Sequence, residues 1–113
     1  MFHMLTCFNL KPGFQIDEFR QAASDFTALM KERQLVHSMG PIGRRQSDTI
    51  LDTDDERDQE YFFIMSFQDR AQSDLAVELI LSREEPGASV HNGVNSMIKD
   101  HIFICWEDVP SEE

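Results

Sequence analysis

The chain has 113 residues and a mass of 13.1 kDa, and 41 % of the residues are hydrophobic. This size and composition predict a single domain over residues 1–113. Ten Lys and Arg against 21 Asp and Glu give a net charge of −11. Nucleic acids and anionic membranes are bound mainly through basic side chains, so the charge argues against both as partners. The first residues lack the basic segment of a secretory signal, and we expect a cytoplasmic protein.

Residues 2–10 predict a strand that is buried on both faces, because almost every residue is apolar or small. The turn sequence Lys11-Pro12-Gly13 ends it. The alternation places these residues on one face: Phe2, Met4, Thr6, Phe8 and Leu10. The residues on the other face are His3, Leu5, Cys7 and Asn9.

Residues 17–33 predict a helix, since apolar residues recur at steps of three and four. Its expected inner face consists of Ile16, Phe19, Ala23, Phe26 and Met30. Gly40-Pro41 then interrupts the chain. We expect a short extended piece at 36–39 and an irregular strand over 42–51.

Residues 52–60 hold six acids and no apolar residue, which predicts a solvated hairpin loop. The segment begins like a calcium-binding loop. However, Arg57 stands where such a loop needs Gly, and Phe63 stands where it needs Glu. Residues 61–67 are aromatic and apolar, and they predict a strand.

The C-terminal part predicts a helix over 69–81 with Asp69 as its cap, and a second helix that begins at Pro86. The expected inner residues of the two helices are Leu75, Leu79, Ile80, Val90, Val94, Met97 and Ile98. A last strand is expected at 101–106. Residues 110–113 are expected to form a frayed tail.

The predicted order is β-α-β-β-α-β, which is typical of the ferredoxin-like α+β fold. In that fold a four-stranded antiparallel sheet carries its helices on one face. The strand at 61–67 is apolar on both faces, so the face without helices needs a cover. We expect a homodimer that packs through this sheet face.

This order and the opening Phe2-His3-Met4-Leu5-Thr6-Cys7-Phe8 resemble the dimeric α/β barrel superfamily, and most closely its stress-responsive A/B barrel proteins. The resemblance implies a dimer with a ligand cavity between helices and sheet in each subunit. The superfamily includes monooxygenases, haem-degrading enzymes, isomerases, polyketide cyclases and proteins of no known activity. The fold therefore does not fix a reaction.

The resemblance also implies two candidate catalytic residues, His3 and His91. In the branch with cyclase activity, a first-strand His polarises the carbonyl of the substrate, and His3 matches that position. A second His follows a Pro in that branch. The family spacing falls on Ala88 here, and His91 lies three residues further, on the same helical face. A polarising His3 and a proton-moving His91 form one hypothesis. Two structural or exposed histidines form the alternative.

The ligand-binding residues that we predict are mostly methionines, which line adaptable apolar pockets. They come from different elements: Met4, Met39, Met65 and Met97. Asn9 and Arg45 are the polar candidates for contact with a ligand head group. Such a cavity would take an acyl, fatty-acid-like or polyketide-like molecule. The alternative is that these side chains only fill the core.

No cofactor or metal is expected. There is no GxGxxG motif, no P-loop, no CxxC and no closely spaced pair of histidines. A haem-linked enzyme remains an alternative, with Asn9 and His91 in the roles of haem-degrading relatives and Trp106 departing from their pattern. The sequence is also compatible with a small monooxygenase, and with a non-catalytic, stress-related or structural dimer without ligand. Cys7 and Cys105 are expected to be buried, reduced thiols, and a disulfide between them is the alternative if they face each other.

Overall fold

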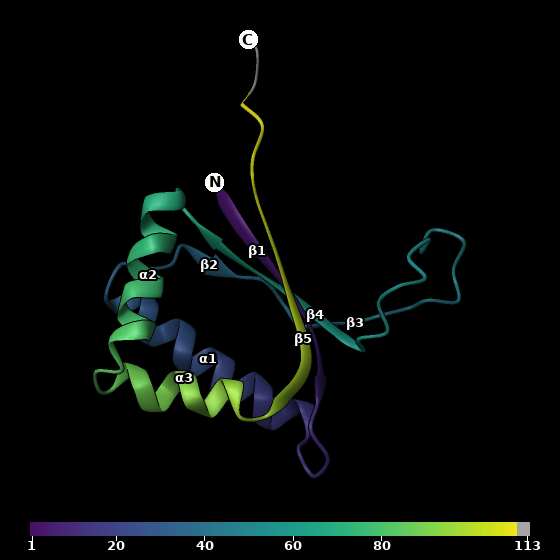
Figure 1. The fold of residues 1–113 in the computed structure, drawn as a ribbon, viewed down its shortest axis with the longest axis horizontal. Coiled ribbons are helices and arrows are strands. Elements are labelled where there is room, and N and C mark those ends of the chain that lie inside the picture. Colours follow the sequence, from purple (N-terminus) through teal and green to yellow (C-terminus); the bar gives the residue numbers. More distant parts are fainter. Residues whose placement is uncertain (111–113) are drawn as a thin grey trace.

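In the computed structural model, which describes residues 1–110, three helices lie on one side of a five-stranded sheet (Figure 1). The elements are β1 (Phe2–Leu10), α1 (Ile16–Glu32), β2 (Ser38–Met39), β3 (Gly43–Arg44), β4 (Tyr61–Phe67), α2 (Arg70–Ser82), α3 (Gly87–Asn95) and β5 (Ile98–Glu107). The predicted ferredoxin-like order is thus confirmed, with the second strand divided into two short pieces. Most of the predicted tail at 110–113 lies outside the described residues.

The sheet has the order β2-β4-β1-β5, with β3 also paired to β4, and all pairings are antiparallel. Residues opposite one another across a ladder point to the same face. Thr6 lies between Phe63 and Phe103, whereas His3 lies between Ser66 and Trp106. We call the side covered by the helices the helix face and the opposite side the outer face.

The core lies between α1 and the helix face of β1 and β4. Phe8, Phe19 and Met30 are fully buried, and the rings of Phe8 and Phe19 have their centroids 4.5 Å apart. The expected inner face of α1 is confirmed, since Ala23 and Phe26 are also buried. Close packing of this kind fixes α1 against the middle of the sheet.

The outer face is apolar and is not covered along its centre. Its exposed members are Ile64, Ile102, Ile104 and Trp106, each with 36 to 40 % of its surface accessible. Leu5 and Phe62 continue the same surface, and both are half-buried. This face therefore presents a contiguous apolar area to solvent.

The predicted strand over 42–51 is wrong apart from Gly43–Arg44. Regular pairing with β4 ends at Arg44, and the side chain of Arg45 turns toward the acidic segment. Residues 45–60 then form a long connection that extends away from the body of the molecule (Figure 1).

The C-terminal half follows the prediction with three differences. Asp69 caps α2 as predicted, where its carboxylate accepts a hydrogen bond of 2.8 Å from the backbone N–H of Gln72. Leu75 is 53 % exposed instead of inward, because Ser73 and Ala76 occupy the buried side of α2. Strand β5 begins at Ile98, three residues earlier than expected, and α3 ends before Met97. No helix within residues 1–110 is long and apolar enough to span a membrane.

Candidate functional site

A cavity of about 580 Å³ lies between the helix face of the sheet and the three helices. This volume falls within the range of small-molecule sites. Its apolar lining includes Met4, Met30, Met39, Met65, Phe19, Phe26, Phe63 and Phe103. The exposed lining residues lie on α2, α3 and β5, as Val77, Asn95 and Cys105 do. The cavity is therefore closed beneath α1 and opens between these three elements.

Thr6 is one of the residues that line this cavity. The residue is 1 % exposed, and its Oγ1 has no hydrogen-bond partner among residues 1–110. Its neighbours on the helix face are Phe63 and Phe103, whose rings carry no acceptor or donor oxygen or nitrogen. By contrast, the buried hydroxyl of Thr27 donates to the carbonyl oxygen of Ala23 at 2.8 Å. A buried hydroxyl without a partner is unusual, because it loses its hydrogen bond to water.

His91 reaches the cavity from α3 and is half-buried. Its ring centroid lies 5.7 Å from that of Phe26 on α1. Burial lowers the pKa of the imidazole below its usual value of 6.5, because a charged ring is poorly solvated there. At neutral pH His91 is therefore an uncharged base that can accept a proton.

His3 lies on the outer face and does not line the cavity, which corrects the expected pairing of His3 with His91. Its Nδ1 lies 2.8 Å from the hydroxyl of Ser66, and its Nε2 lies 2.8 Å from a carboxylate oxygen of Asp108. The bond to His3 lowers the pKa of the Asp108 carboxyl group. The sheet itself separates the two histidines, because β1 alternates and Met4 takes the cavity side.

Ser66, His3 and Asp108 thus form a hydrogen-bonded Ser–His–Asp row that the sequence spacing did not predict. Ser66 lies inside β4, which is paired on one side with β1 and on the other with β2. Hydrolases place the nucleophile beside free backbone N–H groups at a turn or a helix N-terminus. The row is therefore a structural set of hydrogen bonds that joins β1, β4 and the segment that follows β5.

The polar ligand candidates Asn9 and Arg45 do not reach the cavity. Asn9 lies at the end of β1, where its Nδ2 donates to Asp100 at 3.2 Å and its Oδ1 accepts from the backbone N–H of Glu60 at 2.8 Å. Of the four predicted methionines, Met4, Met39 and Met65 line the cavity, whereas Met97 packs against the core outside it.

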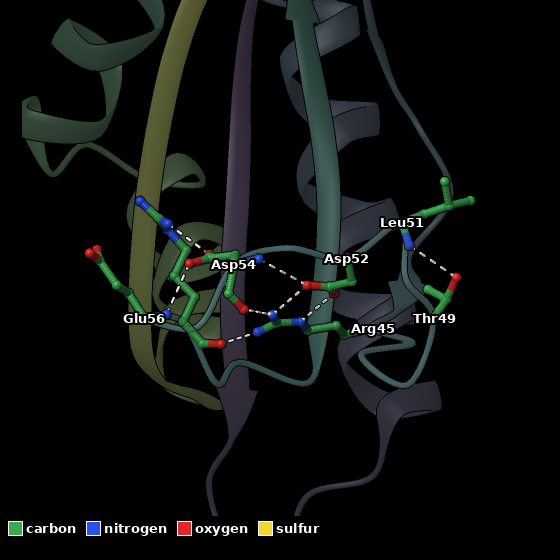
Figure 2. Close-up of polar contacts among 7 residues, drawn as sticks. Arg45, Thr49, Leu51, Asp52, Asp54 and Glu56 are labelled. Atoms are coloured by element: carbon green, nitrogen blue, oxygen red, sulfur yellow. Dashed lines mark hydrogen bonds and ion pairs between the residues drawn. The ribbon is translucent and has the colours of Figure 1, made fainter.

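Arg45 instead organises the acidic segment (Figure 2). Its guanidinium donates to both carboxylate oxygens of Asp52 at 2.8 Å and to the carbonyl oxygen of Asp54 at 2.6 Å. It also donates to the carbonyl oxygen of Arg57. The hydrogen bond from Arg45 lowers the pKa of the Asp52 carboxyl group. A bidentate pair of this kind holds the segment in one shape, so Arg45 is a structural residue here.

The two cysteines lie on opposite faces, and both thiols are free. Cys7 is buried on the outer face of β1, and burial raises the pKa of its thiol. Cys105 lies on the helix face at the opening of the cavity and is exposed, contrary to the prediction. The reason is that β5 is an edge strand and the cavity leaves its helix face uncovered.

The sequence matches, over residues 1–113, the model of a family described as a family of unknown function, DUF6614. The chain belongs to the DUF6614 family. No curated protein matches the sequence.

Solved structures resemble this DUF6614 protein in fold. A protein of Arabidopsis thaliana, At3g17210, has a TM-score of 0.74 at 8 % identity and is covered completely, as is this chain. A dimeric ferredoxin-like protein of unknown function from Jannaschia sp. CCS1 has a TM-score of 0.65 at 12 % identity, with 95 % of this chain and 98 % of the other covered. SnoaB, a cofactor-independent oxygenase from Streptomyces nogalater, has a TM-score of 0.59 at 8 % identity, with 98 % and 95 % covered. These likenesses confirm the ferredoxin-like fold.

The residues that the haem alternative needs are not brought together in the DUF6614 protein. His91 lines the cavity, Asn9 lies at the end of β1 outside it, and Trp106 lies on the outer face beside His3, at 5.2 Å between ring centroids. Within residues 1–110, no group of three His, Cys, Asp or Glu side chains is arranged to hold a metal ion. The cavity with Thr6 and His91 is thus the candidate site.

Proposed function

We propose that this DUF6614 protein binds an apolar small molecule of the acyl or polyketide-like kind in the cavity beneath its helices. The observation that carries the proposal is the cavity itself, which is about 580 Å³ in volume and is lined mainly by apolar side chains, Met and Phe prominent among them. A mostly apolar pocket with a few convergent polar groups is typical of such sites. The four methionines in the lining allow the pocket to adapt to ligands of differing shape.

If the bound molecule reacts, His91 is the base that the site supplies. Its imidazole is uncharged at neutral pH because burial lowers its pKa. It could accept a proton from a carbon or hydroxyl next to a ligand carbonyl and return the proton elsewhere on the same molecule. This step uses no cofactor. It does not involve His3, which is bonded to Ser66 and Asp108 on the other side of the sheet.

A second copy of the chain is proposed to cover the outer face and so form a homodimer. Ile64, Ile102, Ile104 and Trp106 together present the apolar surface that a two-fold partner would bury. The similarity in fold to a protein described as a dimeric ferredoxin-like protein supports this arrangement. The ligand cavity lies on the helix face, so it stays open in such a dimer.

Native mass spectrometry of the purified protein tests both parts, with a second measurement after denaturation and solvent extraction. The proposal predicts a dimer that carries an additional mass of some hundreds of daltons per subunit, which extraction releases as an apolar compound. A dimer without added mass that also takes up no apolar compound offered to it would favour the alternative of a dimer without ligand. A monomer would contradict the assignment of the outer face.

A further inference from the structure

We infer that Thr6 selects the ligand of this cavity: its hydroxyl binds a neutral carbonyl or hydroxyl group of the ligand and disfavours a carboxylate at the closed end. This inference rests on the proposed function and adds to it the chemical class of the bound head group. A ketone, ester or phenol would fit the site, whereas a fatty acid with its carboxylate pointing inward would not.

The unpartnered hydroxyl of Thr6 favours a ligand that can hydrogen-bond to it. Thr6 lies in β1, in the middle of the sheet, and its Oγ1 is buried without a partner among the described residues 1–110. The other buried hydroxyl in the lining is engaged, because Ser73 donates to the backbone carbonyl of Arg70 at 2.7 Å. Thr6 therefore has both a donor and an acceptor free for a bound molecule. A ligand that supplies the missing hydrogen bond gains the interaction that the empty site lacks.

The charge of the lining disfavours a carboxylate that points inward. The imidazole of His91 is uncharged at neutral pH, and Thr6 is neutral. Within the described chain, Arg70 is the one lining residue with a permanent positive charge, and it is the exposed first residue of α2. Asp74, which is negatively charged, also lines the cavity and follows one turn later on the same helix. An inward carboxylate would thus be buried without a compensating charge, whereas a neutral carbonyl needs only one donor.

The test compares ligands that differ only in the head group. Displacement of the neutral fluorophore 1-aminoanthracene is followed at pH 7.5 with 2-nonanone, nonanoate and the purely apolar n-butylbenzene. We expect 2-nonanone to bind at least about tenfold more tightly than nonanoate. Thr6→Val should lower the affinity for 2-nonanone by about fivefold, which corresponds to the loss of one neutral hydrogen bond. The affinity for n-butylbenzene should change by less than about twofold.

Two variants control this experiment. Thr6→Ser keeps the hydroxyl and should keep the preference for the ketone. Ser82→Ala removes a hydroxyl on α2 that donates to the backbone carbonyl of Leu79 and does not line the cavity, so it should leave the ketone affinity unchanged. Equal binding of nonanoate and 2-nonanone to the native protein, or an equal loss of both neutral ligands in Thr6→Val, overturns the inference alone. If the native protein binds neither the fluorophore nor any of the three ligands, the proposed function falls as well.

Discussion

Replacing Thr6 with valine is expected to stabilise the protein in the absence of ligand. Valine has nearly the shape of threonine but no hydroxyl, and the hydroxyl of Thr6 is buried with no partner in residues 1–110. Burial of an unsatisfied polar group costs roughly 1–3 kcal/mol. Removal of that cost should raise the free energy of unfolding by about 1–2 kcal/mol. For a domain of this size the gain corresponds to a Tm increase of roughly 4 °C per kcal/mol.

Urea denaturation and differential scanning calorimetry on delipidated protein measure this effect. Thr27→Val is the matched control, because Thr27 is also buried but its hydroxyl donates to the carbonyl of Ala23. That variant should lose about 0.5–1 kcal/mol of stability, which is the net value of one hydrogen bond. The two valine variants should therefore change stability in opposite directions. If Thr6→Val destabilises the ligand-free protein as Thr27→Val does, the hydroxyl of Thr6 has a partner and the reasoning is wrong.

Three further predictions concern the rest of the molecule. The pKa of His91 is lower in the folded protein than the ordinary value of 6.5, so the unfolded chain binds more protons between these two values. The free energy of unfolding of the native protein should therefore fall, relative to that of His91→Gln, as the pH drops below 6.5. Urea titrations from about pH 8 to about pH 5 measure this difference. The lowered pKa of Asp52 means that its pairing with Arg45 stabilises the fold above the ordinary carboxyl pKa of 3.8. The stability lost in Asp52→Asn should therefore disappear as pH falls well below that value, and equal differences at about pH 7 and about pH 2 would contradict the pairing. Ile104→Glu should convert the proposed homodimer to a monomer in sedimentation equilibrium, whereas Leu75→Glu, at an exposed position on α2, should leave the mass unchanged.

The fold was predictable where local patterns and burial agree. Strands β1 and β4 appear at the predicted residues, because each is a short apolar run between turn residues. Helix α1 was predictable from its spacing of apolar side chains. The strand expected at 42–51 failed, because its path depends on Arg45 meeting Asp52 and on backbone carbonyls of the same connection. The local pattern of apolar and polar residues does not reveal such contacts.

The site was predictable in part. Met4, Met39, Met65 and His91 reach the cavity, as the convergence of elements suggested. His3 does not, and the alternation along β1 already separated it from Met4, so that the two could not both face the helices. Thr6 shares the face of Met4, and a polar residue in the middle of an otherwise apolar face was the available signal. That its hydroxyl lacks a partner depends on β4 and β5, and no pattern in β1 alone reveals it.

Methionine methyl NMR tests most directly whether the cavity beneath the helices takes the ligand. The chain has six methionines, each of which gives one methyl signal. The methionines that line the cavity are Met4, Met30, Met39 and Met65, whereas Met1 and Met97 lie outside it. Titration with 2-nonanone should shift the first four signals and leave the last two in place. Shifts confined to Met1 and Met97, or no shifts at saturating ketone, would contradict the account.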